Sequence, residues 1–302
     1  MCCFSKEVES VSNTQICVLP STLNGADCQT VVYSCEVSMK RGGKQTAMIL
    51  PAFNPGNNPD NILLHDMSDC RYFFTDLDRL IQKPTYKSAV MQTNSWSESS
   101  APLKVKQVGA YKVSVAPSLQ DLKRIDQSVL PINLDLLKEF DKRYSAEHSY
   151  VVAAFDPDGP QSAEFSPFAY THLKSPLGWF VPTLHFHSSK MQPAEEFDHT
   201  IYLCNSVVPA APLELNWKSQ LRKLCNRAKP SIPLVEALAL DTFGKFEMHG
   251  FYENTDLHLP DSTQVDAREH DFTETLEAMR RKKSFPERMF QSMMPYRFNF
   301  SW

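Results

Sequence analysis

Glycine is scarce in this chain, which has only 9 glycines in 302 residues, against 21 prolines. Folds that bind nucleotide phosphates need glycine where the backbone must approach a phosphate closely. The sequence contains no Walker loop, no Gly-x-Gly-x-x-Gly fingerprint, no Gly-x-Ser-x-Gly elbow and no His-Glu-x-x-His motif. These absences exclude the glycine-rich phosphate-binding loops and two common kinds of hydrolase motif.

Long apolar segments and a secretory leader are also absent from the sequence. No run of about 18 apolar residues occurs, so no membrane span is expected. The first residues, Met1 to Phe4, are followed at once by polar residues, without the basic and then apolar order of a signal peptide. None of the eight cysteines forms a Cys-x-x-Cys pair, so a zinc module is not expected. We therefore predict a cytoplasmic protein with reduced cysteines.

Charge and hydrophobicity are ordinary for a globular protein, with a net charge of -4, 42% hydrophobic residues and 22% charged residues. This composition excludes a disordered chain and a polycationic nucleic-acid binder. The basic run at residues 280–283 is interpreted as the solvated end of a helix, so it gives no strong nucleic-acid signal. A chain of this length would bury about three quarters of its unfolded surface, which is enough for a substantial core.

The order of the expected elements predicts an α+β protein with a mostly antiparallel sheet and several short helices packed on it. Strands are expected at residues 14–19, 29–37, 47–51, 62–65, 103–115, 150–155, 178–187, 198–204 and 245–251. Helices are expected after Ser68 or Asp69, after Ser118, after Asn133, and near residues 216–227 and 271–274. A polar connection at residues 85–104 is expected to be a mobile loop.

The domain organisation predicted from these elements is a single α+β domain at residues 1–265, followed by a C-terminal extension at residues 266–302. The extension combines a helix with several aromatic residues. Exposing so much apolar surface would be unfavourable, so the aromatic end is expected to dock on the body of the protein or on a protein partner.

Cys2 is the first candidate for catalysis. Removal of Met1 would leave Cys2 with a thiol beside a free α-amine. An α-amine has an ordinary pKa of about 7.7–8.0 and can accept the thiol proton, which is the chemistry of N-terminal-nucleophile hydrolases. Glutamine amidotransferases of this kind begin Met-Cys-Gly and choloylglycine-type amidases begin Met-Cys, so the match here extends to one residue. The alternative is that Cys2 is an incidental residue on an exposed terminus.

A group of histidines is the second candidate site. His185 and His187 alternate in a predicted strand, so their imidazoles would lie on the same face. His199 opens the next predicted strand, which is expected to pair with the first as a hairpin and to add a third imidazole. Neutral imidazoles in this arrangement can bind Zn²⁺ or Fe²⁺, with Glu195 or Glu196 as an oxygen ligand or base. The alternative is a set of structural histidines hydrogen-bonded to the nearby acids.

Several phrases of the sequence occur in a recognisable order, including MCCFS at residues 1–5, PTLHFH at residues 182–187 and EFDHT at residues 196–200. In this order they resemble a group of mostly bacterial proteins that begin Met-Cys-x-Phe and carry Pro-Thr-x-His-x-His ahead of Phe-Asp-His. The resemblance spans residues 1–204 and brings no activity with it. It implies only that Cys2, His185, His187 and His199 lie inside the shared phrases.

The sequence leaves open whether the protein is an enzyme. The leading hypothesis is a hydrolase of C–N bonds, with Cys2 as nucleophile and Glu195 in support. The alternatives are a non-catalytic binding or scaffold protein, and a protein that binds a divalent metal through His185, His187 and His199.

Overall fold

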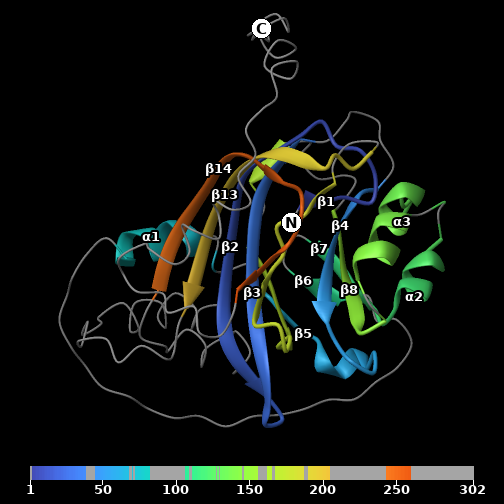
Figure 1. Ribbon diagram of the computed structural model, residues 1–302, viewed down its shortest axis with the longest axis horizontal. Coiled ribbons are helices and arrows are strands. Elements are labelled where there is room, and N and C mark those ends of the chain that lie inside the picture. Colours follow the sequence, from blue (N-terminus) through green and yellow to red (C-terminus); the bar gives the residue numbers. More distant parts are fainter. Residues whose placement is uncertain are drawn as a thin grey trace, which may run out of the picture.

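The computed structural model describes residues 2–38, 45–67, 70, 72–81, 106–108, 111–126, 128, 130–144, 146–155, 162–164, 167–186, 190–204 and 243–259. Within these residues the chain forms two main β-sheets that share one hydrophobic core. Figure 1 shows α2 (Leu119–Lys123) and α3 (Leu134–Arg143) beside the smaller sheet. The helix α1 (Phe73–Ile81) lies beside the larger sheet.

The larger sheet has seven strands, and its main path runs β14-β13-β2-β3-β10-β5, with β9 paired to β3. Its strands are β2 (Ser10–Leu23), β3 (Ala26–Ser38), β5 (Leu63–His65), β9 (Ser162–Glu164), β10 (Phe168–Leu173), β13 (Ala194–Cys204) and β14 (Phe243–Glu253). Neighbouring strands are antiparallel except β13 and β2, which are parallel. All residues of β3 from Cys28 to Cys35 and of β10 from Phe168 to His172 are buried, so the centre of this sheet is covered on both faces.

The long hairpin of β2 and β3 turns at Asn24 and Gly25 (Figure 1). Both residues have positive φ, 52° at Asn24 and 81° at Gly25. A two-residue turn with positive φ at both positions is the type I′ geometry that matches strand twist, and Asn-Gly is its preferred sequence. This local signal sets the register of the hairpin.

The smaller sheet has four strands in the order β4-β8-β7-β6. Its strands are β4 (Ala47–Phe53), β6 (Lys106–Val108), β7 (Tyr111–Ala116) and β8 (His148–Phe155). Two short pairs complete the described strands: β1 (Cys2–Cys3) with β12 (His185–Phe186), and β11 (Trp179–Val181) with β15 (Leu257–Leu259). A 3₁₀ turn, η1 (Pro59–Asn61), precedes β5.

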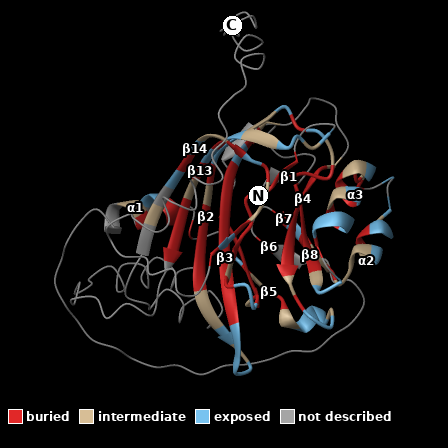
Figure 2. Cartoon of the chain, viewed as in Figure 1, coloured by how far each residue is buried: buried red, intermediate tan, exposed pale blue. Residues whose placement is uncertain are grey.

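Aromatic side chains join the two sheets into one core. Tyr111 of the smaller sheet contacts Phe155 of the same sheet and Phe168 of the larger one, with ring centroids 5.6 and 5.8 Å apart. Phe4, which is fully buried, stacks on Phe155 at 5.9 Å. In Figure 2 the buried residues line the strands of both sheets, whereas α2 and α3 keep an exposed side.

The predicted class is confirmed in its main feature, because the described strands form mostly antiparallel sheets. The helices are fewer than expected: the described residues contain α1, α2 and α3, with η1 as one further turn. Ser118 and Asn133 cap α2 and α3 as predicted. In α3 the buried residues are Leu136, Leu137 and Phe140, whereas Leu134 is 69% exposed.

The predicted hairpin of residues 178–187 and 198–204 is wrong. The first segment is split into β11 and β12, which pair with β15 and β1, whereas β13 pairs with β2 and β14.

The expected loop at 85–104, the helices near 216–227 and 271–274, and the extension at 266–302 lie outside the described residues. In the part of the chain that is described, no helix is both long and apolar enough to cross a membrane. Five of the eight cysteines are buried thiols that form no disulfide: Cys3, Cys17, Cys28, Cys35 and Cys70.

Candidate functional site

His185 and His199 lie together in the interior, as the sequence predicts. Their Nε2 atoms are 3.2 Å apart, and the two rings have centroids 4.7 Å apart. The ring of Phe197 stacks on His185 at a centroid distance of 4.2 Å. Both histidines are at least 95% buried, because β12 brings His185 over the core face of β13. His187 lies outside the described residues.

These two histidines supply two of the donors that a metal would need. Zinc takes four ligands in structural sites and three protein ligands in catalytic sites, at about 2.0–2.1 Å from each imidazole nitrogen. A separation of 3.2 Å between the two nitrogens also fits a direct hydrogen bond between neutral imidazoles. Among the residues that the structure describes, no group of three His, Cys, Asp or Glu side chains could hold a metal. Metal binding therefore stays a prediction that depends on a further ligand such as His187.

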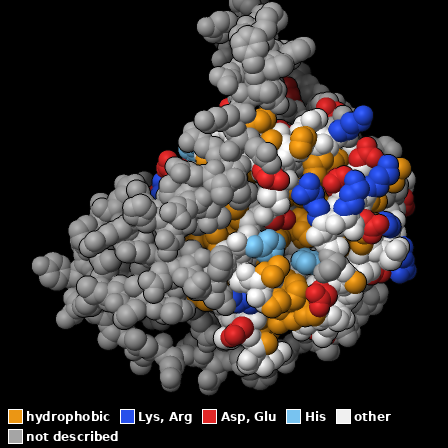
Figure 3. Space-filling view, in the orientation of Figure 1, with side chains coloured by type: hydrophobic (Ala, Val, Ile, Leu, Met, Phe, Trp, Pro, Cys, Tyr) orange, Lys and Arg blue, Asp and Glu red, His pale blue; other side chains and the backbone are white. Residues whose placement is uncertain are grey.

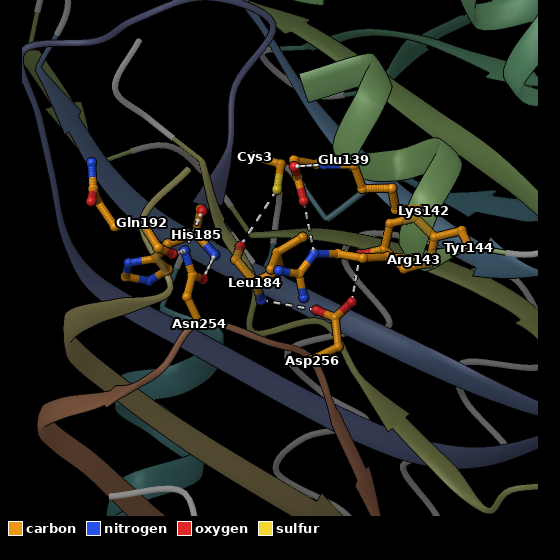
Figure 4. Close-up of polar contacts among 10 residues, drawn as sticks. All are labelled: Cys3, Glu139, Lys142, Arg143, Tyr144, Leu184, His185, Gln192, Asn254 and Asp256. Carbon is orange, nitrogen blue, oxygen red and sulfur yellow. Dashed lines mark hydrogen bonds and ion pairs between the residues drawn. The ribbon is translucent and has the colours of Figure 1, made fainter. Parts of the chain in front are cut away.

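The backbone around His185 is clamped by the turn between β14 and β15 (Figure 4). The Asn254 side chain accepts a hydrogen bond from the His185 amide at 2.7 Å and donates to the His185 and Gln192 carbonyls at 2.9 and 3.0 Å. Asp256 Oδ1 accepts from the amides of Thr183 and Leu184 at 2.9 and 2.8 Å. The turn therefore fixes the position of β12, because its side chains make the backbone hydrogen bonds that a neighbouring strand would otherwise make.

The N-terminal strand β1 lies against β12 in parallel, with Cys2 opposite His185 and Cys3 opposite Phe186. The Cys3 thiol is buried and donates to the Leu184 carbonyl, with Sγ and O 3.5 Å apart. The Phe4 amide donates to the Phe186 carbonyl at 2.8 Å. The structure therefore places the predicted nucleophile residue and one predicted histidine side by side along the backbone.

Glu195 lies near the start of β13, on the same strand face as Phe197 and His199. It is half-buried, and this burial raises the pKa of its carboxyl group. Four residues of strand, roughly 13 Å, separate its backbone from that of His199. Glu195 therefore shares a face with the histidine pair but lies some distance along the strand from it.

A cavity of about 520 Å³ lies where several chain segments end. It is lined by the end of β4, the end of α3, the turn after β10 and the β14–β15 segment: Phe53, Arg143, Tyr144, Glu147, His148, Ser175, Pro176, Leu177, Thr255, Asp256 and His258. On the face seen in Figure 3, histidine side chains reach the surface beside an apolar patch, and many Lys and Arg side chains gather to one side. This site is not predictable from the sequence, because each segment contributes only one to three polar or apolar residues, and no sequence motif connects them.

The inner wall of the cavity contains a hydrogen-bonded pair, Tyr144 and Asp256. The Tyr144 hydroxyl donates to Asp256 Oδ2 at 2.5 Å. Burial raises the pKa of the Asp256 carboxyl, an effect that the hydrogen bonds from Tyr144 and the Leu184 amide partly offset. Burial, followed by the nearby Asp256 carboxylate, raises the pKa of Tyr144 well above its ordinary value. Asp256 accepts three hydrogen bonds from the protein, so its oxygens mainly stabilise the fold.

Arg143 contributes a positive charge to the same cavity. Its Nε lies 3.5 Å from Glu139 Oε2, whereas Lys142 Nζ lies 2.7 Å from Glu139 Oε1. Coulomb attraction falls with distance, so Lys142 is the stronger partner of this carboxylate. The contact with Glu139 is made through Nε, and Arg143 also lines the cavity.

Comparison with solved structures finds distant likenesses to baculovirus P35. No protein-family model matches the chain. Baculovirus P35 is similar over 74% of this chain and 72% of its own, with 15% sequence identity and a TM-score of 0.41. P35 in a complex with caspase-8 gives 12% identity, a TM-score of 0.35, and coverage of 65% of this chain and 64% of P35. TM-scores below 0.5 do not establish that two chains share a fold.

Proposed function

We propose that the protein is a non-catalytic binding protein that holds a segment of a partner protein in the cavity beside α3 and the β14–β15 turn. The observation that carries the proposal is the position of Leu177 at this cavity, where it is 67% exposed. Leu177 is one of three exposed large hydrophobic residues in the described part of the chain. A concave site lined by apolar side chains, with a few polar groups among them, is typical of a binding site.

The rigidity of the cavity wall also supports this function. The Asn254 and Asp256 side chains fix the turn that forms one wall, and the Leu177 amide donates to Ser175 Oγ at 3.2 Å in another. A wall that is ordered before binding loses little conformational entropy when a partner arrives. The cavity volume is in the range of sites that bury a side chain or a small ligand.

The test compares two threonine-to-tryptophan variants. Thr255→Trp places a large ring in the cavity without changing its charge, whereas Thr22→Trp adds the same ring at an exposed position of β2. Partners captured by the immobilised wild-type protein are identified by mass spectrometry, purified, and titrated against all three proteins. Caspase-8, which forms the complex with P35, is one defined protein to include. We expect Thr255→Trp to weaken the binding of a true partner at least tenfold and Thr22→Trp to leave it unchanged; equal binding by both variants would contradict the proposal.

A second candidate function is amide hydrolysis at Cys2, favoured by the register that places Cys2 opposite His185. Parallel strands lie about 4.8 Å apart, so a thiol residue and an imidazole residue are neighbours along the backbone. After removal of Met1, the Cys2 thiolate would attack an amide carbonyl, release the amine and form a thioester that water then hydrolyses.

The hydrolase candidate is tested by intact-mass analysis of native protein before and after reaction with a thiol-directed acylating probe. The function requires that Met1 is absent and that a single acyl group is added at Cys2, and that Cys2→Ala abolishes the addition. Cys3→Ala is the matched control, because the buried Cys3 thiol is bonded to Leu184. Retention of Met1, or acylation that is unchanged in Cys2→Ala, would exclude Cys2 as an N-terminal nucleophile.

A further inference from the structure

Arg143 gives the cavity a preference for one chemical class of ligand. Among the ionisable side chains that line it, Asp256 accepts three hydrogen bonds from the protein itself. Arg143 and Glu147 are both exposed, where water screens the charge of each. Of the two, only Arg143 can donate hydrogen bonds to an anion. The fork of Arg143 has the geometry that binds a carboxylate through two parallel hydrogen bonds.

The rest of the lining adds donors and apolar area next to that fork. His148 and His258 line the same cavity, and His258 is exposed. Phe53, Pro176 and Leu177 supply the apolar part of the wall. A ligand that satisfies both parts must carry a carboxylate immediately beside a bulky apolar group.

We propose that the cavity captures the C-terminal carboxylate of a partner protein whose last residue is bulky and apolar. A single C-terminal residue presents both features at once, because its carboxylate and its side chain leave the same Cα. Internal Asp and Glu residues present the carboxylate without an adjoining apolar group. Capture of chain ends by fixed donors is an established mode of peptide recognition. This assignment rests on the proposed binding function and names the part of the partner that is bound.

The test uses fluorescence anisotropy with a five-residue peptide that ends in Phe and carries a dye at its N-terminus. The peptide is prepared with a free C-terminal carboxylate and, as a second probe, with a C-terminal amide. We expect the wild-type protein to bind the carboxylate form at least tenfold more tightly than the amide. Arg143→Gln should remove this preference, and Arg143→Lys should keep only part of it, because lysine retains the charge and lacks the fork.

Arg124→Gln is the matched control, because Arg124 is 81% exposed on α2 and pairs with an acid three residues earlier in the chain. It should keep the full preference for the carboxylate form. Thermal unfolding of each variant shows whether it is folded. If Arg143→Gln does not fold, Arg143→Lys alone still tests the assignment.

The assignment is overturned by equal binding of the two peptides, by a preference that survives in Arg143→Gln, or by no binding of the carboxylate peptide at millimolar concentration. Free 3-phenylpropionate that binds as tightly as the peptide would also overturn it, since the site would then select a small acid. A partner that binds through an internal segment and is lost in Thr255→Trp would overturn this assignment while leaving the proposed binding function intact.

Discussion

Two buried histidines of the larger sheet, His65 in β5 and His172 in β10, are held in the neutral form by burial. Desolvation lowers the pKa of each to about 4, from an ordinary value of 6.5. His65 Nε2 lies 2.7 Å from Thr171 Oγ1, and His172 Nδ1 lies 2.8 Å from the Leu173 carbonyl oxygen. Neither ring can take up a proton at pH 5–6 without the cost of a buried charge.

The first prediction concerns the pH dependence of stability. A histidine whose pKa is lowered by folding adds stability above pH 6.5, and this stability is lost as the pH falls toward 4. A shift from 6.5 to about 4 corresponds to about 3 kcal/mol for each histidine. We expect the free energy of unfolding, measured by urea denaturation, to fall more steeply between pH 7 and pH 4 in the wild type than in His172→Phe. A slope in His172→Phe that equals the wild-type slope would contradict the prediction.

The second prediction concerns the histidine pair of β12 and β13. If His185, His187 and His199 bind zinc or iron, elemental analysis of protein purified without an affinity tag will find close to one metal per chain. A double variant, His185→Ala and His187→Ala, should contain none. Absence of metal from the wild type as well would leave the 3.2 Å contact of His185 and His199 as a hydrogen bond between two structural side chains.

At the scale of elements, β1 and the two residues after it contact several other strands. Phe4 follows it, is fully buried and stacks on Phe155 of β8. The Phe4 amide bonds to Phe186, and the Ser5 amide bonds to the Ala47 carbonyl of β4 at 2.8 Å. Residues 2–5 therefore connect β12 to the smaller sheet.

The third prediction follows from this connection. Phe4→Ala removes a buried aromatic ring and should lower the free energy of unfolding by about 3–5 kcal/mol. Tyr72→Ala is the control, because Tyr72 is 62% exposed, and its effect should stay within about 0.5 kcal/mol. Chemical denaturation measures both values. A loss of less than about 1 kcal/mol in Phe4→Ala would show that the segment is not part of the core.

Elements with local causes could be predicted from the sequence. Asn24-Gly25 specifies its turn by backbone preference, and Ser118 and Asn133 cap helices by accepting hydrogen bonds from nearby amides. Strand partners could not be predicted in the same way. The composition of residues 178–187 predicts an extended backbone but carries no information about the partner strand. Residues 180–186 are all buried, so burial does not single out one face either. Neighbouring strands in sequence usually pair, and that tendency produced the wrong hairpin.

The candidate site was predictable only in part for the same reason. His185 and His199 come together as expected, yet they do so through β1, β13 and the Asn254 clamp rather than through a shared hairpin. The cavity was not predictable, because Arg143, Tyr144 and Asp256 belong to segments about 110 residues apart in sequence. Asp256 gave one weak signal, since it follows a predicted strand in a polar turn.

At the scale of the molecule, the two sheets share one cluster of buried residues. Tyr111 links Phe155 of the smaller sheet to Phe168 of the larger, so neither sheet keeps its packing if the other unfolds.

The fourth prediction is a single cooperative unfolding transition of this shared core. Far-ultraviolet and near-ultraviolet circular dichroism should give coincident curves in urea, and Phe4→Ala should shift both to lower urea by the same amount. Two separated transitions would show that the sheets are independent.

The pairing of β1 with β12 also sets a condition on biosynthesis. The thiol of Cys3 and its acceptor Leu184 are 181 residues apart in the chain. Ribosomes add roughly 5–20 residues per second, so the first strand waits about 10–40 s for its partner to be made. During that interval the MCCF segment and the core edge of β4 are exposed to solvent or to chaperones. Synonymous codon changes between the two strands, which leave the protein sequence unaltered, would lengthen or shorten this exposure.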